Sequence, residues 1–230
     1  MQDPTETIGN SVRMIMTHVA RFLNKVTDGA IKPAHITLLS LLGHIPAAWA
    51  LWTGRPVFAA IYIVIFGLMD SLDGALAREQ KSASKMGMFF DAVTDRLKET
   101  LLYSALAVYV SRDVTYAKDI GVWVVPAVAA TSLLVSYVKA KGEMAISTDA
   151  HDKQLLNRAF SQGIARYEIR MALLIIGLVS GLLASLLNLI IALNLITASM
   201  RFMEVARLLT IEDSAAKSTV TIKRKTTKEV

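Results

Sequence analysis

The sequence predicts an all-α integral membrane protein, with six transmembrane helices and an N-terminal amphipathic helix that lies beside the membrane. Hydrophobic residues make up 53% of the 230-residue chain, and its mean hydropathy is +0.45. Several apolar runs reach the roughly 20 residues that a helix needs to cross a bilayer. The chain has no cysteine, which excludes disulfides and thiolate metal ligands. We therefore expect one helical membrane domain over residues 1–210.

The first expected element is the amphipathic helix, over residues 8–28. Its apolar residues recur at helical spacing, and its basic residues fall mainly on the other side of the helix. Such a helix can lie on a membrane surface, with its basic side chains near anionic headgroups. Packing of the same apolar stripe on the rest of the protein is the alternative. The apolar positions are Ile8, Val12, Ile15, Met16, Val19, Phe22, Leu23 and Val26, and the basic ones are Arg13, Arg21 and Lys25.

The six spans follow in order and form a bundle over residues 34–208. We place the break between the last two near Ser185 to Asn188. The polar composition of residues 144–165 predicts a loop, and that of residues 211–230 predicts a tail without regular structure. The expected spans are 34–53, 57–77, 88–110, 120–141, 169–186 and 188–208.

The distribution of basic residues predicts the orientation. The formal net charge is +6, but only three of the 25 lysines and arginines fall on the side opposite the termini: Arg55, Arg112 and Lys118. Cytoplasmic loops carry the excess of Lys and Arg in membrane proteins. We therefore expect both termini and the polar loops in the cytoplasm, and the charge gives no reason to expect a nucleic-acid partner.

Four aspartates lie at the cytoplasmic ends of the second and third spans. Asp70 and Asp73 are three residues apart, and Asp91 and Asp95 are four apart, so each pair shares one face of its helix. Carboxylates at membrane depth are costly and normally face a wet cavity or a cation. Carboxylate oxygens suit hard divalent ions, so the four predict a metal site. An ion carrier would also explain acids in membrane helices.

These aspartates belong to a longer pattern over residues 70–95: Asp-x₂-Asp-Gly-x₂-Ala-Arg-x₈-Gly-x₃-Asp-x₃-Asp. The pattern resembles the signature of the CDP-alcohol phosphotransferase family of membrane enzymes. The six-span pattern is similar to that family over roughly residues 8–210. Pro33-Ala34-His35-Ile36-Thr37 resembles a second, looser family motif, in which many members carry Asn where Ala34 stands.

The resemblance implies a role for each residue of the pattern. Two Mg²⁺ ions, with Mn²⁺ as an alternative, would be held by Asp70, Asp73, Asp91 and Asp95, and Asp95 would also be the general base. Thr37, Gly74, Arg78 and Ser84 would contact the CDP-linked lipid donor, and Gly87 leaves room for a close approach to the backbone. Two divalent ions can neutralise a pyrophosphate, and a carboxylate can take the proton of an acceptor hydroxyl. The products would be a phosphodiester lipid and CMP.

The acceptor alcohol is predicted from residues 136–143 and 165–170. These stretches resemble the phosphatidylinositol phosphate synthase branch of the family and its archaeal ether-lipid relatives, which implies inositol phosphate as acceptor. Its phosphate would need a basic pocket, for which Lys139, Arg158, Arg166 and Arg170 are candidates. Lys and Arg at cytoplasmic helix ends are also ordinary in membrane proteins. Glycerol 3-phosphate is the rival acceptor.

The expected partners are therefore the CDP-linked lipid, a polar alcohol phosphate and the surrounding membrane lipids. Family members are usually homodimers, so the resemblance implies a homodimer here. Two other functions use the same acids: divalent-metal transport and metal-dependent hydrolysis of the CDP-lipid. Transport leaves Gly74, Gly87 and Arg78 at their fixed spacing unexplained, and hydrolysis differs from transfer only in needing no acceptor.

Overall fold

The computed structural model describes residues 4–113, 121, 123–146 and 165–226, and the side chains within residues 13–113, 121, 123–146, 165–211 and 214. Over these ranges the chain forms helices joined by short turns, and contains no strand. The helices are α1 (Pro4–Val26), α2 (Pro33–Trp52), α3 (Pro56–Glu79), α4 (Lys85–Arg112), α6 (Val124–Ala145), α8 (Tyr167–Ser180) and α9 (Leu183–Thr226). The predicted all-α class is confirmed.

Four stretches are long and apolar enough to cross a membrane. They are Pro33–Trp52, Pro56–Glu79, Val124–Ala145 and Leu183–Ile211, which match the first, second, fourth and sixth predicted spans. The third and fifth predicted spans do not meet these criteria of length and apolar content, for different reasons. Five charged residues stand between positions 91 and 99 of α4, and α8 has only 14 residues, about 21 Å of helix. The structure therefore supports an integral membrane protein, and the count of six remains a prediction.

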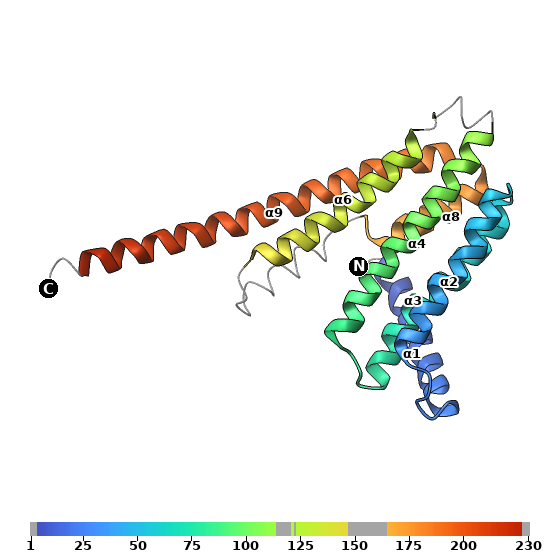
Figure 1. Cartoon of the computed structure of the whole chain (residues 1–230), viewed down its shortest axis with the longest axis horizontal. Helices are drawn as coiled ribbons and strands as arrows, with labels where there is room; N and C mark the ends of the chain where they lie inside the picture. The colour runs from blue at the N-terminus through green and yellow to red at the C-terminus, as the bar shows by residue number, and fades with distance from the viewer. Residues whose placement is uncertain (1–3, 114–120, 122, 147–164, 227–230) are drawn as a thin grey trace.

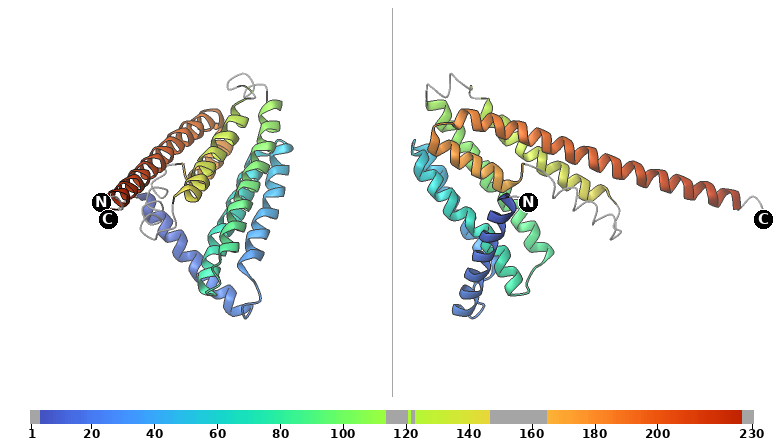
Figure 2. Two further views of the ribbon diagram at one scale, coloured as in Figure 1. Left: turned by 60° about the vertical axis from the view of Figure 1, so that its left-hand side comes forward. Right: turned by 180° about the vertical axis from the view of Figure 1, so that it is seen from behind.

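The helices form two groups (Figure 1). Helix α2 packs against both α3 and α4, and α1 lies across the part of α3 nearest the α3–α4 turn. Helix α6 runs along α9, and α8 lies between α9 and α3. The views in Figure 2 show the C-terminal half of α9 projecting beyond the other helices. Lines of small residues, including Ala47, Ala59 and Ala105, bring the first group close together.

A glycine decides how closely α2 approaches α3. A Cβ atom built on Gly43 would lie 2.0 Å from the ring of Phe66, so only glycine leaves room for that ring. The Ser40 hydroxyl, one turn earlier on α2, donates to the Phe66 carbonyl oxygen at 2.8 Å. Close packing and a hydrogen bond therefore fix the same point of contact, which sets where the aspartates of α3 stand relative to α2.

The connection from α8 to α9 corrects one predicted boundary. The chain turns at Gly181, whose φ of +76° is left-handed, four to seven residues before the predicted break at Ser185 to Asn188. Glycine adopts this conformation without the steric cost that other residues carry. Gly177 also lets the turn fold back, because its Cβ position lies 3.1 Å from the Leu183 backbone. The apolar run continues through this turn, which is why hydropathy alone misplaced it.

Helix α9 continues to Thr226, whereas the composition predicted no regular structure after residue 210. Extending an existing helix avoids the cost of nucleating a new one, so a polar sequence can continue it. Within the bundle, polar groups tie α9 to α6. The Asn194 amide donates to the hydroxyls of Thr131 at 3.1 Å and Ser132 at 3.0 Å, and Arg201 donates to the Val135 carbonyl oxygen at 3.0 Å.

Helix α1 has one packed side and one exposed side. Ala20 is buried with Ile36, Ala75 and Leu76, which places α1 directly against the turn of α3 that follows the second aspartate. The opposite side exposes Met14, Ile15, Val19, Phe22 and Val26. One side of this helix therefore packs on the protein, as the alternative drawn from the sequence expected, and contact of the exposed side with a membrane surface remains a prediction.

Candidate active site

The four aspartates lie near the turn that joins α3 to α4. Helix α3 ends at Glu79, and Ser84 begins α4 by accepting a hydrogen bond from the Gly87 N–H at 3.0 Å. Gln80 fixes the turn from outside, because its amide donates to Asn24 of α1 at 2.9 Å and to the Ile31 carbonyl oxygen at 2.8 Å. The turn therefore places the two acidic helix ends at the same end of the bundle.

Asp73 is the most deeply placed of the four and is only 6% exposed. It accepts a hydrogen bond of 2.5 Å from the hydroxyl of Thr37, which lies near the start of α2. The two motifs, residues 33–37 and 70–95, which the family resemblance assigns to the same donor, thus meet through this bond. Thr37 orients one predicted metal ligand, a contact that sequence spacing could not reveal.

Asp70 and Asp95 meet at a residue that the sequence analysis did not include in the site. The Lys98 ammonium lies 2.7 Å from Asp70 Oδ1 and 2.8 Å from Asp95 Oδ1, and its side chain is fully buried. Lys98 stands one helical turn after Asp95 on α4, so it shares the face of that aspartate. This spacing, and the presence of a charge within a predicted span, were the signals in the sequence. The ammonium links a carboxylate of α3 to one of α4.

Two of the carboxylates lie close together, because Asp70 and Asp95 contact the same Lys98 ammonium. Among the described residues, however, no three acidic or imidazole groups converge as a ready-made metal site. The four predicted carboxylates therefore lie in one region of the structure, but they do not converge on a single point. Asp70 and Asp95 face Lys98, whose positive charge offsets theirs, and Asp73 faces the Thr37 hydroxyl.

The donor set nevertheless suits a divalent ion. The four groups offer only carboxylate oxygens, the ligands that Mg²⁺ and Mn²⁺ prefer. Asp70 Oδ2 is buried and accepts no hydrogen bond from the described residues. A buried carboxylate oxygen without a donor is costly, and a cation would satisfy it. The residues present therefore fit the metal that the sequence predicted.

The residues predicted to bind the donor surround the same helix ends. Arg78 is exposed, and a Cβ on Gly74 would lie 3.5 Å from its Nη1 atom. Ser84 and Gly87 are exposed and bonded to each other, so Ser84 has a structural role as the cap of α4. Whether these side chains contact a nucleotide remains a prediction.

The four basic residues predicted for the acceptor do not share one environment. Lys139 and Arg166 are exposed, with ion pairs to Glu143 at 3.8 Å and to Glu168 at 3.6 Å. Arg158 lies outside the described residues. Arg170 is the exception, because it is 3% exposed and points into the bundle.

Arg170 is held by Glu99, a second residue that the sequence analysis left without a partner. Its Nε and Nη2 atoms donate to Glu99 Oε1 at 3.0 and 2.6 Å, and its Nη1 donates to the Ala165 carbonyl oxygen at 2.6 Å. Arg96 pairs with the other oxygen of Glu99 and donates to Ser136 at 2.9 Å. Helices α4, α6 and α8 are joined by this network. Arg170 therefore has a structural role that its position in the sequence did not predict.

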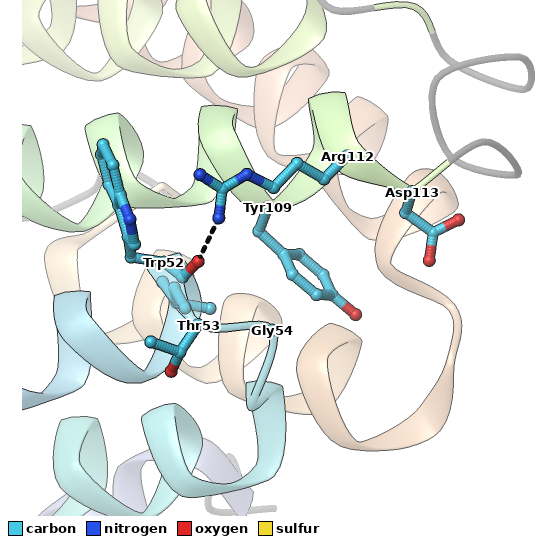
Figure 3. Close-up of a pocket in the computed structure, with 7 residues that line it drawn as sticks. Trp52, Thr53, Gly54, Tyr109, Arg112 and Asp113 are labelled. Carbon is cyan, nitrogen blue, oxygen red and sulfur yellow. Dashed lines mark hydrogen bonds between the residues drawn. The ribbon is translucent and has the colours of Figure 1, made fainter.

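A pocket of about 370 Å³ lies at the other end of the bundle (Figure 3). It is lined by Leu51, Trp52, Thr53, Gly54, Tyr109, Arg112 and Asp113, and the Arg112 guanidinium donates to the Trp52 carbonyl oxygen at 2.7 Å. Arg112 is 17 residues after Asp95 on α4, about 26 Å along the helix. No residue predicted for the site lines this pocket.

Comparison with known proteins identifies the family. Residues 30–203 match the family model described as CDP-alcohol phosphatidyltransferase. The chain belongs to this family. The matched range includes the whole 70–95 pattern, Thr37, and the four candidate basic residues between 139 and 170, so the resemblance expected from the motif is confirmed.

Two curated proteins are similar to the chain in sequence. The chain is 31% identical over 117 residues to archaetidylinositol phosphate synthase of Pyrococcus horikoshii, and 29% identical over 131 residues to phosphatidylinositol phosphate synthase of Mycobacterium tuberculosis. These alignments cover 50% and 56% of this chain and 57% and 58% of the relatives. The chain thus spans a little over half the length of these relatives.

Solved structures support the fold. The M. tuberculosis phosphatidylinositol phosphate synthase with CDP-DAG bound matches with a TM-score of 0.68 at 24% identity, over 84% of this chain and 94% of that one. The same enzyme in complex with manganese and citrate matches with a TM-score of 0.65 at 23% identity, over 83% and 88%. At these identities the likeness establishes a shared fold.

Proposed function

We propose that this chain transfers a phosphatidyl-type group from a CDP-linked lipid to a hydroxyl of a polar alcohol phosphate and releases CMP. The observation that carries the proposal is the meeting of Asp73 of the 70–95 pattern with Thr37 of the 33–37 motif through a 2.5 Å hydrogen bond. The membership of the chain in the CDP-alcohol phosphatidyltransferase family supports it. So do the names of two relatives, an archaetidylinositol phosphate synthase and a phosphatidylinositol phosphate synthase.

Asp70, Asp73, Asp91 and Asp95 are the proposed ligands of two divalent ions, Mg²⁺ or Mn²⁺. When bound, such a pair would neutralise the pyrophosphate of the donor and stabilise the charge that develops on the leaving CMP. The complex of a structural relative with manganese supports the choice of metal. Thr37 would keep Asp73 turned toward the site, because its hydroxyl fixes one carboxylate oxygen.

Asp95 is the proposed general base. Its side chain is partly exposed, unlike that of Asp73, so an acceptor hydroxyl can reach it. The carboxylate would take the hydroxyl proton as that oxygen attacks the phosphorus joined to the lipid, and the bond to CMP would break. Arg78 would bind a donor phosphate through a charge-assisted hydrogen bond, and Gly74, Ser84 and Gly87 would line the nucleotide.

Inositol phosphate is the proposed acceptor, with glycerol 3-phosphate as the rival. The exposed Lys139 and Arg166 are the best candidates for its phosphate, and Arg158 and Arg170 complete the predicted set. Because Arg170 is buried against Glu99, we expect it to act by holding the α4–α8 contact in place.

We also propose the finer arrangement in the membrane. Helices α4 and α8 would complete six spans, with the charged part of α4 facing the polar site and not lipid. The exposed apolar side of α1 would lie on the membrane surface. The site and both termini would face the cytoplasm, by the positive-inside rule. The active form would be a homodimer.

The test is release of CMP by the purified full chain, given CDP-diacylglycerol, Mg²⁺ and one acceptor at a time. We expect release with inositol phosphate, less with glycerol 3-phosphate, and little with inositol or serine. EDTA and Asp91→Asn should each abolish release, whereas Asp28→Asn, an exposed aspartate in the turn after α1, should leave it unchanged. Release that needs no acceptor would indicate hydrolysis. Metal entry into liposomes without CMP release would indicate a carrier.

The acceptor residues are tested by steady-state kinetics with the same assay. Arg166→Ala and Lys139→Ala should raise the KM for the acceptor more than the KM for the donor, because each removes a phosphate partner. Arg13→Ala, another exposed arginine, is the matched control. A larger change in the donor KM would reassign both residues to the CDP-lipid.

A further inference from the structure

The Lys98 ammonium is buried between carboxylates of two helices. It lies 2.7 Å from Asp70 Oδ1 on α3 and 2.8 Å from Asp95 Oδ1 on α4, and its side chain has no exposed surface. An ammonium is costly to remove from water unless it is paired. Two carboxylates from different helices satisfy that need here. The same contact holds together two of the four acids of the site.

The ammonium uses the oxygens that a divalent ion would need. Asp70 and Asp95 are both proposed metal ligands, and each directs one oxygen to Lys98. A metal ion bound at these groups would lie close to the ammonium and be repelled by it. Lys98 and the metal therefore compete for the same negative charge.

Lys98 also has a partner that does not belong to the carboxylate group. Its ammonium lies 5.8 Å from the centre of the Tyr167 ring, within the range of a cation–π interaction. Tyr167 is the first residue of α8, a helix that carries none of the four aspartates. The ammonium can thus lose a carboxylate oxygen to a metal and keep an attractive contact inside the bundle.

We propose that Lys98 is a positioning residue that acts through Asp70 and Asp95. Its ammonium holds the two carboxylates together across α3 and α4 while no divalent ion is bound, and it competes with the ion for their oxygens. This inference rests on the metal site of the proposed function. It has two consequences: loss of the ammonium strengthens metal binding, and it makes the stability of the protein depend on metal.

The first measurement is Mn²⁺ binding to the full chain in detergent micelles, followed by electron paramagnetic resonance of the free ion. Lys98→Gln keeps hydrogen-bonding capacity without charge and should lower the Kd for Mn²⁺ at least about tenfold, or about 1.4 kcal/mol. Lys98→Arg keeps the charge and should stay within about threefold of the wild type. Lys25→Gln, at an exposed lysine of α1, should leave the Kd unchanged.

The second measurement is thermal unfolding of the same proteins with and without Mn²⁺. Lys98→Gln should unfold at a lower temperature than the wild type in EDTA, and saturating Mn²⁺ should recover most of the difference. A role in packing alone would lower the unfolding temperature equally in both conditions and leave the Kd unchanged.

Several outcomes would overturn the proposal. One is an equal or weaker affinity of Lys98→Gln for Mn²⁺. Another is failure of that variant to fold even in saturating Mn²⁺, because a counter-ion that metal replaces is dispensable once metal is bound. Wild-type protein that binds no Mn²⁺ would refute the proposed metal site as well. Wild-type binding with an unchanged Kd in Lys98→Gln would refute the role of Lys98 alone.

Discussion

The buried pair of Glu99 and Arg170 gives the most quantitative prediction about stability. Both side chains are 3% exposed, and two nitrogens of Arg170 bond to one oxygen of Glu99 at 2.6 and 3.0 Å. Glu99→Leu removes the carboxylate and leaves the buried guanidinium with the Ala165 carbonyl oxygen as its remaining partner within this network. Breaking a buried pair by removing one partner costs about 3–5 kcal/mol. At roughly 2–4 °C per kcal/mol for a chain of this size, the unfolding midpoint should fall by about 6–20 °C.

The assay is thermal unfolding of the purified chain in detergent, for Glu99→Leu, Arg170→Met and the double variant. Because the double variant leaves neither charge uncompensated, it should be more stable than Glu99→Leu alone, although it makes fewer polar contacts. The exposed pair of Arg166 and Glu168 provides the control, since Glu168→Leu should change the midpoint by less than about 2 °C. A fall of less than about 2 °C for Glu99→Leu, or additive losses in the double variant, would refute the structural role given to this pair.

Three further predictions concern the helix contact and the site. Asp95→Asn should reduce CMP release at least about 10²-fold, because it removes the proton acceptor, while Mn²⁺ binding is partly kept; near-normal turnover would exclude a general base here. Gly43→Ala should destabilise the protein by about 1–3 kcal/mol in thermal unfolding, because its Cβ would lie 2.0 Å from the Phe66 ring, whereas Gly67→Ala, with open space around its Cβ position, should be neutral or stabilising. Ser84→Ala should lower the free energy of unfolding by about 1 kcal/mol, because the helix cap is lost, and Ser84→Asp should restore it. If Ser84→Asp also restores the KM for the donor, the serine contributes to the nucleotide site only through the cap.

Hydropathy, together with the positions of proline, predicted most of the helices. The prolines at positions 33 and 56 begin α2 and α3 within one residue of the expected starts, because proline fits the first turn of a helix. The α8–α9 break was misplaced, since an apolar run continues across it and only the left-handed Gly181 marks the turn. The helical continuation of α9 past residue 210 was missed because composition carries no information on whether a preceding helix continues.

The site was predictable where it depends on local spacing. Acids three and four residues apart share a helix face wherever the helices go, so the 70–95 pattern predicted that these acids lie at one end of the bundle. Contacts between distant helices were not predictable in this way. Lys98 reaches Asp70, 28 residues away, and Arg170 reaches Glu99, 71 residues away. Arg170 also shows that a basic residue at a helix start can be structural, because its partner decides its role.

The central claim is that the carboxylates at the ends of α3 and α4 bind the divalent ions on which transfer depends. Anomalous diffraction at the manganese edge, from crystals of the full chain grown with Mn²⁺, tests it most directly. We expect two manganese peaks enclosed by Asp70, Asp73, Asp91 and Asp95. Crystals without a peak among these four side chains would contradict it.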